Sequence, residues 1–210
     1  MVSFIVDPFS YDKTVELARA REYVDSFLDA NDLDHVSEVL TEARDAKDIS
    51  KWTQYGWYDF ETRELFVNVK RSRTPVKTPG FSWSFTGSKA DLTAPGILAH
   101  ETGHHIHNLW SRRVDPIDRR KLMTEIVPKI RRLEPAVSGY EPNVHETIAE
   151  AMRLFIMNPS LLREGRPVRW ALLTDVIGVH PLHDAPWHEV LKNAHPKLIA
   201  SLEKWIERRN

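Results

Sequence analysis

The segment His100-Glu101-Thr102-Gly103-His104 narrows the possible folds of this chain more than any other stretch, because it falls inside a run with helical apolar spacing. On an α-helix over residues 95–111, His100 and His104 project about 40° apart on one face, and Glu101 lies about 60° from His104. The opposite arc carries Leu98, Thr102, Ile106 and Leu109. The helix can therefore bury one face and turn its histidines toward a cleft.

This spacing suits a metal ion. Two neutral imidazoles one helical turn apart can bind one Zn²⁺ at roughly 2.0–2.1 Å. Glu101 can border the same site as a general base that takes a proton from a water molecule at the metal. The alternative is a helix with surface histidines, because H-E-x-x-H alone is a pattern of moderate specificity. A metal site needs a third ligand, and the chain has no cysteine to supply it.

Glu146 and Glu150 are candidates for that ligand, four residues apart on a predicted helix over residues 143–157. One carboxylate could complete a His₂Glu site, and the other could accept the free ring N–H of a ligand histidine. A solvated helix face with two acids is the alternative. The neighbouring side chains favour a buried helix, in which two acids need a cation as partner. These neighbours are Ile148, Ala149, Ala151, Met152 and Phe155.

The two helices together resemble those of gluzincin metallopeptidases, and more narrowly the zinc domain of anthrax lethal factor and its relatives. Those proteins carry H-E-x-G-H and, on a later helix, Asn-x-x-Glu-x-x-Ala-Glu-Ala. The matching residues here are His100-Glu101-Thr102-Gly103-His104, Asn143, Glu146, Ala149-Glu150-Ala151 and Arg153-Leu154. The resemblance covers roughly residues 80–210.

The resemblance implies an α+β, zincin-like fold with a small mixed sheet, an active-site helix and a mostly helical C-terminal half. It implies zinc-dependent hydrolysis of peptide bonds, as in a metalloendopeptidase. The implied site residues are His100, His104 and Glu146 as Zn²⁺ ligands, Glu101 as general base, Glu150 as the partner of a ligand histidine and Tyr140 as an oxyanion stabiliser. The Tyr140 match departs from the family pattern, since the local order is Gly-Tyr and the spacing to Glu146 is one residue shorter.

Periodicity predicts the remaining elements of a single domain over residues 1–210, with 1–50 as a helical N-terminal extension or cap and 51–210 as the zincin-like core. Before the metal helix we expect helices over 10–30 and 34–46, a hairpin of 57–60 and 65–69 around the turn 61–64, and a strand over 81–86. After it we expect helices over 116–133 and 195–208, with short helices and loops over 158–194. Asp115 should cap the helix at 116, and Pro128 should interrupt it.

The strand over 81–86 comes just before the metal helix. In zinc peptidases a strand at this point forms the edge of the cleft, to which an extended substrate can add as a further strand. A peptide or protein substrate is therefore the expected partner. An ordinary core strand is the alternative.

Charge and composition argue against other partners. The chain has 29 basic and 30 acidic residues and a net charge of −1, so no overall field favours nucleic acid or an anionic membrane. No apolar run approaches membrane-spanning length, and the N-terminus lacks the pattern of a signal peptide. We expect a cytoplasmic protein, with export by another route as the alternative. The oligomeric state is not indicated.

Further histidines and other functions remain open. His107 faces the expected cleft and could compete as a ligand, whereas His105 should be packed or exposed and His145 should line the pocket or be structural. His180, His183 and His188 form a second histidine-rich segment that is typical of polar surface, and Trp110 and Trp205 are expected in the core. The alternative functions are a catalytically silent zinc-containing scaffold or protein-binding module, and a metal-free interaction protein.

Overall fold

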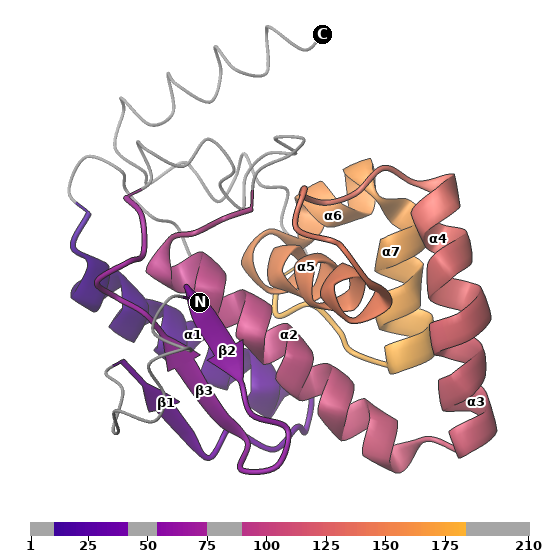
Figure 1. The fold of residues 1–210 in the computed structure, drawn as a ribbon, viewed down its shortest axis with the longest axis horizontal. Helices are drawn as coiled ribbons and strands as arrows, with labels where there is room; N and C mark the ends of the chain where they lie inside the picture. The colour runs from indigo at the N-terminus through magenta and orange to yellow at the C-terminus, as the bar shows by residue number, and fades with distance from the viewer. Residues whose placement is uncertain (1–10, 42–53, 75–89, 184–210) are drawn as a thin grey trace, which may run out of the picture.

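The computed structural model describes residues 11–41, 54–74 and 90–183, and this part of the chain is an α+β structure with a small sheet (Figure 1). In chain order its elements are α1 (Lys13–Ala30), β1 (Glu38–Leu40), β2 (Gly56–Tyr58), β3 (Glu64–Val67), α2 (Ala94–Arg113), α3 (Pro116–Lys121), α4 (Val127–Leu133), α5 (Val144–Met157), α6 (Pro159–Gly165) and α7 (Pro167–Ala171). Leu122–Ile126 and Leu172–Ile177 form π-helical turns.

Side-chain caps begin the principal helices. Asp12 and Asn143 each accept two backbone N–H groups at the starts of α1 and α5, and Thr93 accepts one at the start of α2. Asp115 caps α3, as predicted. Each cap satisfies N–H groups that have no partner within their own helix, so the helix starts are set locally by the sequence.

Pro128 interrupts the helical stretch from residue 116 to 133, as predicted. The interruption takes the form of the π-helical turn Leu122–Ile126, after which α4 begins with the proline in its first turn. Proline lacks the N–H that would bond to the carbonyl four residues earlier, so the chain changes its hydrogen-bond register there.

The sheet has the strand order β1-β3-β2. The predicted hairpin is confirmed, with β2 antiparallel to β3 and Trp57 opposite Phe66. In the turn, Asp59 Oδ1 accepts the N–H groups of Glu61 and Thr62 at 2.8 and 3.0 Å. These hydrogen bonds stabilise the turn between the two strands, and the aspartate that makes them is a local feature of the sequence.

The predicted helix over residues 34–46 is wrong over its described part. Residues 38–40 instead form β1, which pairs in parallel with β3, and residues 42–46 lie outside the described residues. Ser37 precedes the strand and bonds the far end of the hairpin, its N–H to the Arg63 carbonyl and its hydroxyl to the Thr62 carbonyl. A short isolated helix is marginal, so pairing with an existing strand prevails.

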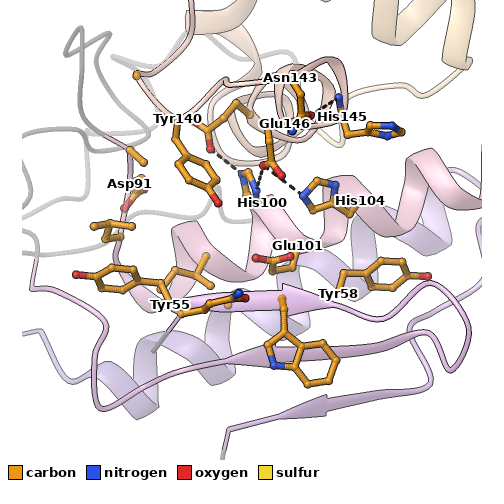
Figure 2. A pocket seen from close by; sticks show the side chains of 18 of the residues that line it. Tyr55, Tyr58, Asp91, His100, Glu101, His104, Tyr140, Asn143, His145 and Glu146 are labelled. Atoms are coloured by element: carbon orange, nitrogen blue, oxygen red, sulfur yellow. Dashed lines mark hydrogen bonds and ion pairs between the residues drawn. The ribbon is translucent and has the colours of Figure 1, made fainter. Parts of the chain in front are cut away.

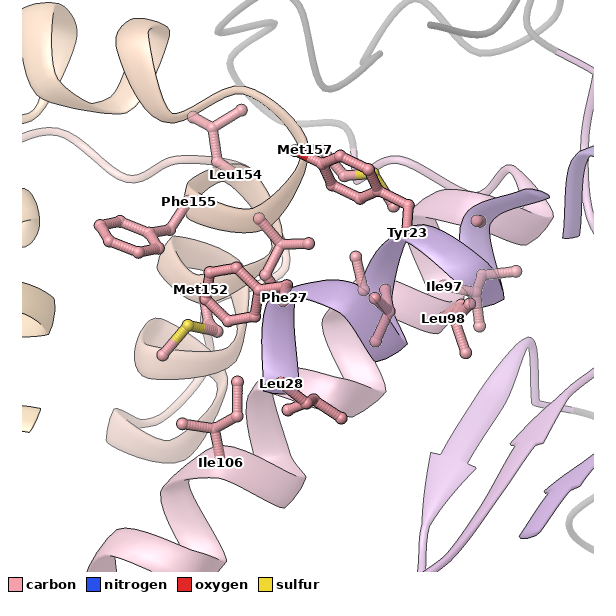
Figure 3. Packing of buried hydrophobic residues seen from close by; sticks show 14 of the residues in the cluster. Tyr23, Phe27, Leu28, Ile97, Leu98, Ile106, Met152, Leu154, Phe155 and Met157 are labelled. Carbon is pink, nitrogen blue, oxygen red and sulfur yellow. The ribbon is translucent and has the colours of Figure 1, made fainter. Parts of the chain in front are cut away.

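Helix α2 is the centre of the structure, since it packs against α5, α1, β2 and β3 (Figure 1). The apolar arc predicted for it is buried, with Leu98, Thr102 and Ile106 each 1% exposed. Figure 3 shows side chains of α1, α2 and α5 meeting in one core. The labelled members are Tyr23, Phe27, Leu28, Ile97, Leu98, Ile106, Met152, Leu154, Phe155 and Met157. Helix α1 is therefore part of the core.

A second apolar cluster joins the α4 region to α5, and Trp110 packs against it in a partly buried position. Its buried members are Leu122, Val127, Ile130, Ile148 and Leu172. The predicted strand 81–86, the predicted helix 195–208, Trp205 and His188 lie outside the described residues. Within the described ranges, no helix combines the length and the apolar character that crossing a membrane requires.

Candidate metal centre

A cleft of about 820 Å³ lies where β2, α2 and the start of α5 meet (Figure 2). Helix α2 contributes His100, Glu101 and His104 to its wall, and α5 contributes Glu146 and Glu150. The structure thus brings together the five residues that the sequence places at a metal site and beside it. These side chains come from two helices separated by 30 residues of sequence, and tertiary packing brings them together.

Three candidate ligand atoms converge in this cleft. The Oε2 atom of Glu146 lies 3.0 Å from His100 Nε2 and 3.4 Å from His104 Nε2. Four ligands placed tetrahedrally at roughly 2.0–2.1 Å from a zinc ion are about 3.3–3.4 Å apart from one another. The two distances from Glu146 Oε2, 3.0 and 3.4 Å, are close to this value.

Two carboxylates are near enough to the histidines to act as a ligand. The buried group His100, Glu101 and His104 offers ligand atoms that all lie within 4.8 Å of one another, so this group could hold a metal ion. Glu146 has one oxygen within 3.4 Å of both Nε2 atoms, so it is a second candidate carboxylate ligand. Both Glu101 and Glu146 are therefore placed to serve as a carboxylate ligand beside the two histidines.

Glu150 fixes the ring of His100. The Nδ1 atom of His100 lies 2.7 Å from Glu150 Oε1. An ionised carboxylate can only accept a hydrogen bond, so Nδ1 is the donor, and the ring held in this way turns Nε2 toward Glu146 and the cleft. A ligand histidine held in this way by a carboxylate is the usual arrangement around protein-bound zinc.

The charges of these groups favour a cation. Burial alone would lower the pKa of His100, but the hydrogen bonds to Glu146 and Glu150 raise it to about 10. Burial alone would raise the pKa of Glu146, but the two histidines lower it to about 2. The carboxylates are therefore ionised, and their negative charge favours a bound cation at the histidine nitrogens. That cation can be either a proton or a metal ion.

Gly56 lets strand β2 approach Glu101. A Cβ atom on Gly56 would lie 2.9 Å from Glu101 Oε1 and 2.4 Å from Ile97 Cγ2, so a larger residue would displace the carboxylate. Glu101 is buried as a result. Burial raises its pKa, and the nearby His100 and His104 only partly oppose this. A carboxylate with a raised pKa is a stronger base than an exposed one.

Gly103 lets α2 and α5 touch. A Cβ atom on Gly103 would lie 2.9 Å from both the Cα and the carbonyl oxygen of Ala149, and 3.0 Å from Met152 Cβ. The close approach of the helices allows His104 to reach Glu146. Neither glycine contact was predicted from the sequence, although the glycine of the H-E-x-G-H segment is the signal that could have revealed the second one.

Tyr140 lines the cleft. Its ring lies beside that of His100, with 5.7 Å between the centroids, and the residue is 52% exposed (Figure 2). Burial of the hydroxyl end and the nearby carboxylates raise its pKa, so the phenol stays neutral and can donate a hydrogen bond.

His105 is packed rather than exposed, and it is used structurally. Its Nε2 atom donates to the Asp34 carbonyl at 2.6 Å, so Nδ1 of the neutral ring accepts from the Tyr58 hydroxyl at 3.0 Å. Asn108 Nδ2 donates in turn to that hydroxyl at 3.0 Å. This chain of bonds joins α2 to β2 and to the segment before β1.

The other histidines lie apart from the three converging atoms. His107 lines a separate hollow of about 580 Å³ beside Trp110, and its ring centroid is 5.3 Å from that of His145. His145 lines both the cleft and this hollow. The His180 N–H bonds to Asn31 Oδ1, and the His183 ring stacks on Tyr23.

No protein-family model, curated protein or solved structure matches the chain. The fold and the site define a class nevertheless. This is an α+β protein whose longest described helix carries a buried His-Glu-x-x-His group that could hold a metal ion.

Proposed function

We propose that the protein is a zinc-dependent hydrolase that cleaves peptide bonds, as a metalloendopeptidase does. The observation that carries this proposal is the convergence of His100 Nε2, His104 Nε2 and Glu146 Oε2 in a cleft that the Glu101 carboxylate also lines. A structural zinc site has four protein ligands and no need of a base, whereas a catalytic one has three and keeps a position open.

Zinc fits the donor set. His100, His104 and Glu146 offer two imidazole nitrogens and one carboxylate oxygen, which suit this ion better than magnesium or calcium. When bound, zinc would supply Lewis-acid chemistry, by polarising a carbonyl group and lowering the pKa of water. Glu150 would keep the His100 ring in the tautomer and orientation that expose Nε2.

Two further side chains have roles in the reaction. Glu101 would take a proton from the attacking water and pass it to the nitrogen of the leaving amine, for which its buried position at the cleft wall suits it. Tyr140, as a neutral donor lining the cleft, would stabilise the negative charge that develops on the carbonyl oxygen.

Strand β2 supports a peptide as substrate. Residues 55–58 line the cleft, and among the described strands β2 is at the edge of the sheet, paired with β3 alone. An extended peptide could therefore lie along this strand and form backbone hydrogen bonds with it. The predicted cleft-edge strand 81–86 lies outside the described residues, so this role of β2 was not predicted from the sequence.

The proposal is tested by separating metal binding from hydrolysis. Purified protein should hold about one zinc per chain by elemental analysis. Glu101→Gln should keep the zinc and lose cleavage of a peptide mixture analysed by mass spectrometry, whereas His104→Ala should lose the zinc. Glu22→Gln, an exposed helical position on α1, is the matched control and should change neither property.

Two results would contradict the proposal. Folded wild-type protein without zinc under zinc-replete conditions would remove the metal centre. Zinc binding without cleavage of any peptide in the mixture would instead support the catalytically silent scaffold.

A further inference from the structure

A chain of buried charged groups extends from the Nδ1 side of the His100 ring, through Glu150 and Arg153 to Asp91. We propose that Arg153 and Asp91, the outer members of this chain, hold Glu150 in position and through it set the orientation of His100 and the affinity for zinc. This inference rests on the proposed metal centre. It assigns positioning roles to two residues that do not contact the three converging ligand atoms.

Arg153 forms hydrogen bonds with both carboxylate oxygens of Glu150. Its Nε atom lies 3.2 Å from Glu150 Oε1, and its Nη2 atom lies 3.0 Å from Oε2. The same Oε1 atom accepts from His100 Nδ1 at 2.7 Å. A two-point contact with a planar guanidinium fixes the plane of the carboxylate, which a single-point contact cannot do. The direction of the His100 ring therefore depends on Arg153.

Asp91 anchors the other side of Arg153. Its Oδ2 atom lies 3.8 Å from Arg153 Nη1, while its Oδ1 atom accepts the N–H and the hydroxyl of Thr93 at 3.0 and 2.8 Å. Thr93 is the cap of α2, and a Cβ atom on Gly96 in the first turn would lie within 2.6 Å of the Asp91 carboxyl group. The chain thus leaves the start of α2, crosses to α5 and returns to α2 at His100.

The members of this chain are buried, although Asp91 and Glu150 also line the cleft. Asp91, Glu150 and Arg153 are 5%, 1% and 2% exposed. A buried carboxylate needs a compensating charge, and Arg153 supplies it to both acids. Without that partner the Glu150 carboxylate would be able to rotate, and the His100 ring would lose its fixed orientation.

Charge and geometry would act in opposite directions in a variant without the arginine. Removing a positive charge favours binding of a nearby cation. Losing the two hydrogen bonds to Glu150, in contrast, leaves the His100 ring less well oriented. Arg153→Lys separates the two effects, because lysine keeps the charge and loses the planar two-point contact. We therefore expect Arg153→Lys to weaken zinc binding through geometry alone.

Arg169 provides a matched control. It is 1% exposed and lies between two acids, with Nη1 3.0 Å from Glu141 Oε2 and Nε 3.9 Å from Glu134 Oε2. Its contacts join α7 to the loop that carries Tyr140 rather than to His100. Arg169→Lys should therefore disturb packing to a similar degree without reaching the metal ligands.

The experiment measures zinc affinity by competition with a chromophoric chelator, beside urea unfolding of the same preparations. Arg153→Lys should raise the zinc Kd by about 10- to 100-fold, the usual effect of losing an outer partner of a metal ligand. Histidine ¹⁵N spectra should show the Nδ1–H signal of His100 displaced. Arg169→Lys should lower stability and leave the zinc Kd and this signal unchanged.

Asp91→Asn is a second variant that keeps the test possible if Arg153→Lys does not fold. Its amide keeps an oxygen that can accept from Thr93, but it removes the negative charge beside Arg153. It should raise the zinc Kd in the same direction by a smaller factor. Wild-type zinc affinity in the folded variants, or an equal loss in Arg169→Lys, would overturn the inference. Failure of the metal centre itself would be evident separately, as wild-type protein that binds no zinc.

Discussion

Replacing Gly103 by alanine should push apart the two helices that carry the ligands. The added Cβ atom would lie 2.9 Å from the backbone of Ala149. Non-bonded carbon atoms prefer about 3.5–4.0 Å, so α2 and α5 must separate locally by roughly 0.6–1 Å. Overpacking of this kind costs typically 1–3 kcal/mol, and the better helix propensity of alanine offsets about 1 kcal/mol of it. We expect a net loss of about 0–2 kcal/mol in the free energy of unfolding.

Zinc binding should suffer more than stability from Gly103→Ala. Metal–ligand distances tolerate changes of only about 0.2 Å, whereas this substitution moves Glu146 relative to the histidines by more than that. The zinc Kd should rise roughly tenfold or more, measured by chelator competition, with urea unfolding in parallel. Ser111→Ala, near the end of the same helix, is the control and should leave the zinc Kd unchanged. Wild-type zinc affinity in Gly103→Ala would refute the argument that helix contact sets the ligand geometry.

Three further predictions concern the surroundings of the site. Tyr140→Phe should lower kcat by about 10- to 1,000-fold in steady-state assays while zinc content stays unchanged, because it removes one donor to the developing oxyanion; an unaltered kcat would exclude this role. Asn143→Ala should cost about 1 kcal/mol in urea unfolding, because it removes the cap of α5, and equal stability would show that the cap is dispensable. Burial, with the His145 and His104 rings nearby, lowers the pKa of His107 from 6.5 to about 4. Between these two pH values the unfolded chain binds a proton at His107 and the folded chain does not. That part of the stability is present above pH 6.5 and is lost as the pH falls toward 4, by up to about 3 kcal/mol. His107→Phe should flatten this dependence when both proteins are unfolded in urea with a chelator present, and parallel pH profiles would contradict the assignment.

The two helices of the site were predictable because their signals are local. Periodic apolar residues and the four-residue spacings of His100 with His104 and of Glu146 with Glu150 are local features of the sequence. The hairpin was predictable for the same reason, since a polar turn separates two strands of alternating pattern.

The interactions that complete the structure join residues far apart in the chain, and no local sequence pattern predicts them. Strand β1 pairs with β3, 26 residues further along the chain. Three residues with weak intrinsic preference adopt the conformation that this tertiary pairing requires. The contact of Gly56 with Glu101 and the link from Asp91 to Arg153 likewise depend on how distant elements pack. Only the placement of α2 against both β2 and α5 reveals them.

The metal centre can be tested in a crystal of the zinc-loaded protein, by anomalous diffraction on both sides of the zinc absorption edge. We predict one strong zinc peak within about 2.0–2.2 Å of His100 Nε2, His104 Nε2 and an oxygen of Glu146, with Glu101 beside the ion and not bound to it. A zinc peak ligated by other residues, or none in this cleft, would contradict the assignment.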